Sequence, residues 1–306
     1  MKKRLAIFDL GTNTFNLLVV DLKGGKFSKV YTNKQAVKLG QGGLSDGFLK
    51  DDAQKRAFMS IKDSMTEIAN LGTDLVVAIG TSALRSAKNG PQFIKRVEDQ
   101  LNLEIEVVDG IREAELVYKG VKYSGILNDD IDLIMDIGGG SVEFIIASNN
   151  EVKELFSFRT GVARLLHRFD PSDPIKEEEI KAIYDDSKKA FQPLFEKLKE
   201  YKIHRFIGSS GSFDSILEML AAKKGISKRQ AGNVISFEDY SMIRELIIKA
   251  TKDERFKLPG LIPMRVDYIV MAVILISLVM EEVGINVIHQ CDYSLKEGVL
   301  AENLNL

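Results

Sequence analysis

The sequence has few of the residues that build disulfide frameworks or metal clusters. Its 306 residues include one cysteine, Cys291, and three histidines that lie far apart, His167, His204 and His289. A single cysteine excludes an internal disulfide and a cysteine metal cluster, and the scattered histidines argue against a histidine-based zinc site. The formal net charge of −2 gives no global basic field, so we expect no nucleic-acid partner.

Long apolar runs are also missing. The longest, residues 268–280, contains Ser277 and falls short of the roughly 20 residues that span a bilayer, so it predicts a buried core helix. Asp9 follows the apolar residues 5–8, which makes this stretch too short for a signal peptide. We therefore expect a soluble protein in a reducing compartment, most simply the cytoplasm, with no membrane partner.

The sequence does contain a repeated pattern. Residues 5–8 form a short apolar run that ends in the turn Asp9-Leu10-Gly11-Thr12-Asn13-Thr14, and residues 132–135 form another that ends in Asp136-Ile137-Gly138-Gly139-Gly140-Ser141. A second apolar run follows each turn, as expected for two strands joined by a tight loop. Further along, one apolar strand ends at Gly80 and another at Gly208, so the two copies have nearly the same offset.

The two copies predict a duplicated α/β architecture. An amphipathic stretch lies between the paired motifs of each copy, at residues 51–71 and 175–201, and predicts a long helix in each. A chance coincidence of glycines can mimic one pair of motifs, but two pairs and a helix at one offset favour a duplication. We predict domains at residues 1–125 and 126–306, with a last helix that can pack back on the first domain.

The turns that end the strands indicate an anion site. Strand-end loops of two such domains face one cleft, where ligands of open α/β sheets bind. Glycines let backbone N–H groups approach an anion, hydroxyl groups add donors, and the Arg85 guanidinium suits a phosphate. The alternative is that the glycines only form hairpin turns. The predicted phosphate contacts are Gly11, Thr12, Asn13, Thr14, Arg85, Gly138, Gly139, Gly140, Ser141, Gly208, Ser209, Ser210 and Gly211.

Carboxylates accompany these loops. Asp9 and Asp136 end their strands, and Glu143 lies on the strand that returns from the second loop. They either hold Mg²⁺, which uses one or two carboxylates together with phosphates, or accept N–H bonds from their own turns. We favour the metal for Asp136 with Glu143 and leave both interpretations open for Asp9. Spacing alone puts Glu113 in the solvated first turn of a helix.

Four motifs in combination resemble the exopolyphosphatase / guanosine pentaphosphate phosphohydrolase family. They span residues 8–14, 80–85, 110–116 and 135–143, and the likeness covers nearly the whole chain. That family belongs to the sugar kinase–actin–chaperone ATPase superfamily, so the resemblance implies two duplicated RNase H-like (actin-like ATPase) domains with a cleft between them. It further implies Mg²⁺-assisted hydrolysis of a terminal phosphoanhydride of inorganic polyphosphate or guanosine pentaphosphate, Glu113 as the catalytic base, and a homodimer.

Four residues depart from the family's pattern. Asn16, Lys38 and Lys296 stand where arginine is common, and Arg112 replaces a frequent glutamate just before Glu113. A lysine keeps the charge but loses the bidentate fork of arginine, so affinity or chain-length preference can differ. Two alternatives to an exopolyphosphatase stay open: a small-molecule kinase of the same superfamily, and a non-catalytic sensor of polyphosphate or an alarmone nucleotide.

Overall fold

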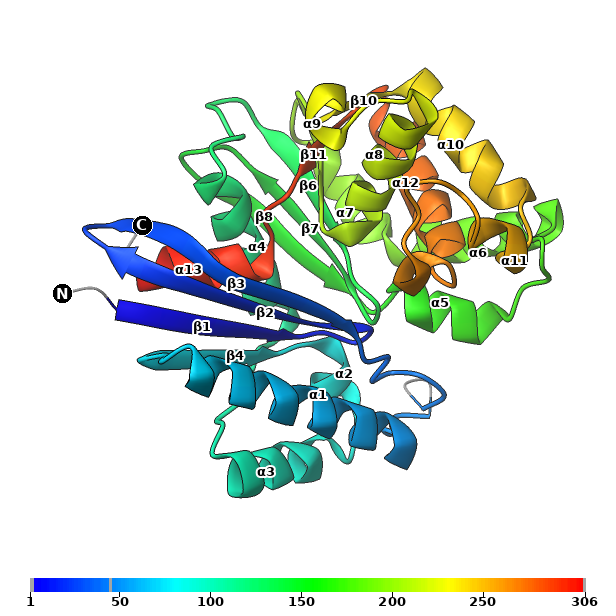
Figure 1. Ribbon diagram of the computed structural model, residues 1–306. Helices are drawn as coiled ribbons and strands as arrows, with labels where there is room; N and C mark the ends of the chain where they lie inside the picture. Colours follow the sequence, from blue (N-terminus) through cyan, green and yellow to red (C-terminus); the bar gives the residue numbers. More distant parts are fainter. Residues whose placement is uncertain (1–2, 44–45, 305–306) are drawn as a thin grey trace.

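The computed structural model describes residues 3–43 and 46–304, and it contains two β-sheets with helices between and around them (Figure 1). The strands of the first sheet are β1 (Lys3–Leu10), β2 (Thr14–Lys23), β3 (Lys26–Ala36), β4 (Leu75–Gly80) and β5 (Glu106–Val107). Those of the second are β6 (Asp132–Ile137), β7 (Val142–Ala147), β8 (Val152–Phe158), β9 (Phe206–Ser209), β10 (Val234–Ser236) and β11 (Val287–Cys291).

The two sheets share one strand order. The first runs β3-β2-β1-β4-β5, with β1 antiparallel to β2 and parallel to β4. The second runs β8-β7-β6-β9-β11, with β6 antiparallel to β7 and parallel to β9, and β10 is added at its edge. Two consecutive hairpins followed by two crossovers thus occur twice in the chain. This topology confirms the predicted fold class of two duplicated RNase H-like domains.

Helices cover the sheets and fill the space between them. Those of the first half are α1 (Asp51–Asn70), α2 (Ser82–Ser86), α3 (Gly90–Leu101) and α4 (Gly110–Tyr123). Those of the second half are α5 (Val162–Phe169), α6 (Glu177–Ala190), α7 (Gln192–Leu198), α8 (Gly211–Lys223), α9 (Lys228–Ala231), α10 (Phe237–Lys249), α11 (Lys252–Arg255), the 3₁₀ helix η1 (Pro263–Arg265), α12 (Ile269–Val283) and α13 (Leu295–Asn303). Figure 1 shows α1 and α3 on the outer face of the first sheet.

The helices α4 and α13 lie between the two sheets (Figure 1). They share one apolar core with Leu5 of β1 and Ile134 of β6, which joins the two halves. Glycines allow the two helices to approach closely, because a Cβ at Gly298 would collide with the Leu116 carbonyl and one at Gly120 with the Ser294 carbonyl. The last helix therefore packs on a helix from the first half of the chain, while the domain boundary itself stays a prediction.

The most apolar helix of the chain is buried, as predicted. In α12, eleven residues including Val273 and Leu275 are buried in the core of the second half. A helix that is hydrophobic all round is expected either in such a core or in a membrane. Within residues 3–43 and 46–304, no helix combines the length and the apolar character that crossing a membrane requires.

One predicted helix is wrong in its extent. Residues 175–201 do not form a single helix but two, α6 and α7, which meet at Phe191. The reason is Pro193 in the first turn of α7, because proline has no N–H to donate to the carbonyl four residues earlier, so the hydrogen bonding of α6 cannot continue through it. The break lets Phe191 enter the core, where its ring packs edge-on against Phe144 of β7 at 5.0 Å.

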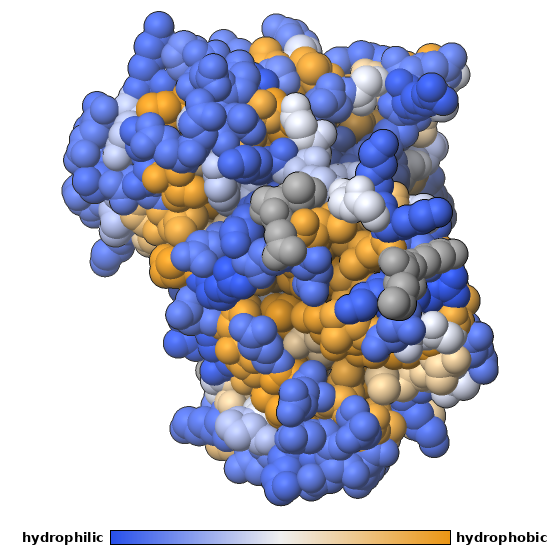
Figure 2. Space-filling model, turned by 90° about the vertical axis from the view of Figure 1, so that its left-hand side faces the viewer, coloured by the Kyte–Doolittle hydropathy of each residue, from blue (hydrophilic) through white to orange (hydrophobic). Residues whose placement is uncertain are grey.

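One face of the molecule is unusually apolar. Figure 2 views the protein from the side where β1 begins and shows apolar side chains gathered between hydrophilic regions above and below. Large exposed apolar side chains of the first half include Leu75 at the start of β4, Val107 of β5 and Ile111 of α4.

Candidate active site

A narrow cleft of about 130 Å³ lies where β1 and β6 end, and loops of both halves form its walls. The predicted site residues that line it are Asp9, Gly11, Thr12, Asn13, Thr14, Glu113, Asp136, Gly138, Gly139, Gly140, Ser141, Ser210 and Gly211. Four predicted residues are not among its lining residues: Arg85, Glu143, Gly208 and Ser209. The cleft also has lining residues that the sequence analysis did not propose as ligand contacts, among them Lys34 and Arg265.

The glycine loop of the second half touches the loops of the first half across the cleft. A Cβ at Gly139 would lie 2.5 Å from the Asn13 amide nitrogen, and one at Gly140 would lie 2.5 Å from Ser82 Oγ and 2.7 Å from Thr12 Oγ1. Any side chain larger than hydrogen would therefore push the halves apart. These glycines serve the contact between the halves and do not merely form turns.

Several polar atoms at this contact have no partner. Thr12 Oγ1, both amide atoms of Asn13, and Ser82 Oγ are buried without a hydrogen bond to any residue that the structure describes. These side chains are only 3%, 6% and 2% exposed, respectively. Because buried polar groups are nearly always hydrogen-bonded, a cluster of unpaired ones beside a cleft indicates a polar ligand.

Arg265 gives the sign of that ligand's charge. Its side chain is buried at 9% exposure, and its guanidinium lies against Gly211, where a Cβ would overlap it. Among the described residues it has no hydrogen bond or ion pair, and its Nε is without a partner. Burial lowers its pKa from the usual arginine value. A buried, unpaired cation costs several kcal/mol, so the cleft is built for an anion.

Asp9 and Asp136 occupy equivalent positions in the two halves. The Asn16 amide Nδ2 donates to Asp9 Oδ2 at 2.8 Å, and the hydroxyls of Ser294 and Ser209 bond to Asp136 Oδ2, the latter at 3.4 Å. Burial raises the pKa of Asp9 to about 6 and also raises that of Asp136. Ser209 therefore holds a cleft carboxylate instead of lining the cleft itself.

Glu113 is buried, so the solvated position that spacing alone predicted for it is wrong. It lies in the first turn of α4, which Asp109 caps by accepting from the Arg112 N–H at 2.8 Å. The packing of α4 between the two sheets directs this turn inward, and Glu113 is only 8% exposed. Burial raises its pKa to about 7, against the opposing charge of Arg85. The adjacent negative charges of Asp136 and Asp9 raise this pKa further.

Arg85 contacts Glu113 rather than the glycine loops. Its Nη1 donates to Glu113 Oε2 at 3.0 Å and to the Val108 carbonyl at 2.7 Å. This leaves Glu113 Oε1 without a hydrogen bond to the described residues. The arginine fixes the carboxylate and partly offsets its charge.

Glu143 lies directly across the β6–β7 ladder from Asp136. Ser157 donates to its Oε1 at 2.8 Å. Burial and the neighbouring charges of Glu113 and Asp136 raise its pKa well above the usual value. Glu113 and Glu143 thus form a pair in which ionisation of one opposes ionisation of the other.

Gly208 has a packing role. A Cβ at this position would collide with the ring of Phe213, the first large side chain of α8. Its Cα hydrogen faces this ring, whereas Ser210 and Gly211 line the cleft.

Three of the residues that depart from the family's pattern form ion pairs. Lys38 Nζ lies 2.8 Å from Asp267 Oδ2 of the other half, and Lys296 Nζ lies 3.1 Å from Glu297 Oε1. Arg112 pairs with Glu302 at 2.7 Å and is not a lining residue of the cleft. Only Lys296 of these three lines the cleft.

The cleft suits a divalent cation that is held in part by a ligand. Asp9 has one carboxylate oxygen without a hydrogen bond to the described residues, and burial raises the pKa of Asp9 and Asp136 against the opposing charge of Lys296. Among the described residues, no group of three or more histidine, cysteine or carboxylate side chains is placed to hold a metal alone. Both observations fit Mg²⁺, which keeps waters and binds through one or two carboxylates together with phosphates.

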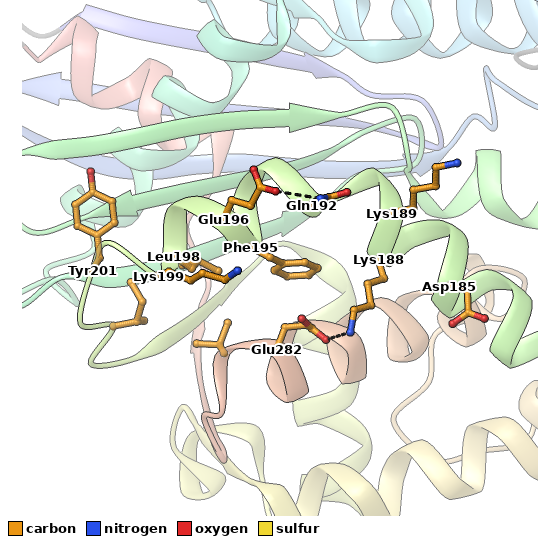
Figure 3. A pocket seen from close by; sticks show the side chains of 12 residues that line it. Asp185, Lys188, Lys189, Gln192, Phe195, Glu196, Leu198, Lys199, Tyr201 and Glu282 are labelled. Carbon is orange, nitrogen blue, oxygen red and sulfur yellow. Dashed lines mark hydrogen bonds and ion pairs between the residues drawn. The ribbon is translucent and has the colours of Figure 1, made fainter.

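A larger cavity of about 620 Å³ lies elsewhere, among α6, α7 and the end of α12 (Figure 3). Its charged side chains are mixed in sign, and Lys188 pairs with Glu282 while Gln192 donates to Glu196 at 3.0 Å. It has neither a glycine loop nor a buried carboxylate. Volume alone therefore does not identify the active site.

The chain is similar to known proteins over nearly its whole length. The sequence model of the Ppx/GppA phosphatase family matches residues 18–306. An exopolyphosphatase from Cytophaga hutchinsonii is 36% identical, with a TM-score of 0.95, and the match covers 99% of this chain and 98% of that chain. The Aquifex aeolicus PPX-GPPA enzyme, 24% identical with a TM-score of 0.80, shares the fold over 99% of this chain and 100% of its own.

Proposed function

The chain belongs to the Ppx/GppA phosphatase family, and from this premise we propose that it is an exopolyphosphatase, which releases phosphate from the end of inorganic polyphosphate. One observation carries the proposal: the buried carboxylate of Glu113 lines the same cleft as Gly11 and Gly139, the glycine loops of the two halves. An acid–base group and an anion site thus share one small volume.

The anion site fits a phosphate group. The unpaired Arg265 supplies a positive charge, and the unpartnered side chains of Thr12, Asn13 and Ser82 supply neutral hydrogen bonds. Phosphoryl transfer requires little covalent chemistry from the protein, and positioning with charge stabilisation provides most of the catalysis. These groups can position a terminal phosphate and stabilise its charge.

Glu113 is suited to act on water. A general base works best when its pKa lies near the working pH, and burial brings the pKa of Glu113 to about 7. Arg85 occupies Oε2, so Oε1 can accept a proton from water that attacks the terminal phosphorus. This favours a hydrolase over the kinase alternative, in which a substrate hydroxyl would have to take the place of the water.

We propose that Mg²⁺ assists the reaction. Asp136 and Asp9 line the cleft and are its proposed protein ligands. Glu143, the third predicted metal ligand, lies across the ladder from Asp136. When bound, Mg²⁺ supplies positive charge to the phosphates and offsets the repulsion among the cleft carboxylates. The raised pKa values of Asp9 and Asp136 support this assignment, because burial disfavours their charged forms more than Lys296 favours them, and a bound cation would favour those forms.

Two finer assignments belong to the same proposal. Guanosine pentaphosphate presents a similar terminal phosphoanhydride and is a second candidate substrate. A homodimer is the proposed assembly, and the apolar face in Figure 2 offers a surface that a second copy could cover. Sedimentation of the full chain tests the dimer, and a monomer at micromolar concentration would contradict it.

The function is tested with the purified full chain and a panel of substrates. Long-chain polyphosphate, tripolyphosphate, guanosine pentaphosphate, and ATP with a set of sugars are each incubated with Mg²⁺, and phosphate release is measured. We expect release from polyphosphate, with a loss of about 10³-fold for Glu113→Gln because the base is removed. The matched control is Glu115→Gln on the more exposed side of α4, which should keep wild-type activity.

The other outcomes separate the alternatives. Equal activity of wild type and Glu113→Gln would remove Glu113 as the base. Phosphorylation of a sugar by ATP without hydrolysis of polyphosphate would identify a kinase. Calorimetric binding of polyphosphate without turnover would identify a sensor.

A further inference from the structure

Lys34 is a cation in the cleft that no part of the proposed mechanism uses. It lies on β3 directly across the ladder from Asn16 of β2, so the two side chains stand on the same face of the sheet. Both residues line the cleft. Asn16 is neutral, and its amide is committed to Asp9. The positive charge at this cross-strand pair therefore comes from Lys34 alone.

The ammonium of Lys34 has no hydrogen bond or ion pair to any residue in the described ranges. This distinguishes it from Lys38 and Lys296, which pair with Asp267 and Glu297. Lys34 remains open to solvent at the mouth of the cleft, and the surrounding protein together with Arg265 lowers its pKa to about 8. An unpaired lysine next to an unpaired arginine is an unfavourable arrangement in the absence of an anion.

Glu113 and Lys34 reach the cleft from different depths of the protein. Glu113 lies on α4 between the two sheets and is only 8% exposed, whereas Lys34 lies on the edge strand β3 and is exposed to solvent. Both residues line the same cleft. The cleft therefore runs from a buried carboxylate at Glu113 to an exposed cation at Lys34.

On the premise of the proposed function, we propose that Lys34 is a substrate-binding residue that holds the body of a condensed phosphate chain, beyond the terminal phosphate that Glu113 and the glycine loops address. A lysine suits this position because its long, flexible stem carries a compact charge that can follow successive phosphates of a chain. Lys34 then sets the preference for longer substrates rather than the rate of the chemical step.

The test compares Lys34→Gln with Lys26→Gln, which removes the same charge from an exposed position at the start of the same strand. For long-chain polyphosphate, we expect Lys34→Gln to raise KM about tenfold, the usual size of one charge-assisted contact. The kcat should change less than about twofold, and Lys34→Arg should restore most of the lost affinity, because it keeps the positive charge. The inhibition constant of orthophosphate, which reports the terminal position, should not change.

Equal KM values for Lys34→Gln and Lys26→Gln would overturn the proposal. So would a rise in the orthophosphate inhibition constant as large as that in KM, because Lys34 would then contact the terminal phosphate. If the wild type releases no phosphate, the proposed function fails, and calorimetry with tripolyphosphate still decides the role of Lys34. Weaker binding by Lys34→Gln than by Lys26→Gln supports the proposal, and equal binding overturns it.

Discussion

The two loops that form the cleft repeat one pattern but present different groups. In the first half, Thr12 and Asn13 direct side chains toward the contact between the halves, and their polar atoms are unpartnered. In the second half, Gly139 and Gly140 fill the matching positions and leave space for those side chains. One loop supplies side-chain donors, and the other supplies the close approach of backbone that these donors require.

A second difference concerns the strand that returns from each loop. Asp9 pairs with Asn16 across the first hairpin, and Asp136 pairs with Glu143 across the second. The amide of Asn16 donates to Asp9, whereas the carboxylate of Glu143 repels Asp136 and Glu113. The duplication has therefore produced one hairpin whose strand-end carboxylate faces an amide and one whose strand-end carboxylate faces a second carboxylate.

The contact between the loops is broken most directly by Gly140→Ala. The new methyl group would meet Ser82 and Thr12 of the other half, so we expect kcat/KM to fall about 100-fold, as displacements of about 1 Å can cause. The Tm of this variant should stay close to that of the wild type, because the strained contact lies between two loops across the cleft and not inside a packed core.

Gly11→Ala provides the contrast. A Cβ there would lie 2.8 Å from the Thr14 carbonyl of the same loop, so this variant should lose stability as well as activity. Phosphate release and thermal unfolding of both variants check the comparison. Equal losses of Tm would contradict the assignment of Gly140 to the contact between the halves.

The anion site is tested by two arginines that are both buried in the second half. Arg265 is unpaired in the cleft, whereas Arg255 pairs with Asp173 at 2.9 Å and donates to the Ala250 carbonyl at 2.6 Å. We expect Arg265→Met to raise KM at least about tenfold without lowering Tm, because it removes a buried charge that only the more distant charges of Asp214 and Asp136 offset. Arg255→Met should keep KM but lose about 3 kcal/mol of unfolding free energy. A destabilised Arg265→Met with normal KM would make Arg265 a structural residue.

The repeat was predictable because its signals are local. Each strand–loop–strand unit is contiguous, and glycine after a short apolar run indicates a turn without knowledge of the rest of the fold. The buried position of Glu113 was not predictable from spacing, since the first turn of α4 is buried only by the packing of the second sheet and α13. The prediction of its role came instead from the resemblance to a family.

Lys34 and Arg265 were missed for a related reason. The β3 strand alternates polar and partly exposed residues at the edge of its sheet and lacks the apolar run that would mark it. Arg265 ends the short η1 helix, which lies between α11 and α12 and outside the repeated motifs. Only the tertiary structure brings these cations to one cleft. In contrast, Pro193 was a readable signal for the break between α6 and α7.

Glu143→Gln places a neutral amide opposite Asp136 in the second hairpin, as Asn16 stands opposite Asp9 in the first. Loss of this charge removes its repulsion of Glu113, so the pKa of Glu113 should fall from about 7. A base must be ionised to act. The acidic limb of the pH profile of kcat should therefore move to lower pH, by about one unit. The control is Glu151→Gln, an exposed change in the same half. An unchanged limb, or one displaced to higher pH, would show that the pair does not set the pKa of the base.

The smallest expected effect is the response of stability to pH and Mg²⁺. Asp9, Glu113, Asp136 and Glu143 all have pKa values raised by burial in the folded protein. The folded state therefore binds these protons more tightly than the unfolded chain, so their contribution is fully present below the unfolded pKa values and is lost as pH rises toward 6 and 7.

Mg²⁺ should offset that loss, because it compensates the ionised carboxylates. We expect Mg²⁺ at saturating concentration to raise Tm by a few degrees, about 2–4 °C, at pH 8 and by less at pH 5, where the carboxylates are protonated. Calorimetric unfolding with and without Mg²⁺ measures both shifts. Asp136→Asn should reduce the shift at pH 8 while Asp185→Asn, on the exposed side of α6, leaves it intact. A shift that is the same at both pH values would place the cation away from the cleft carboxylates, and the functional difference between the two hairpins would then rest on their hydrogen bonds alone.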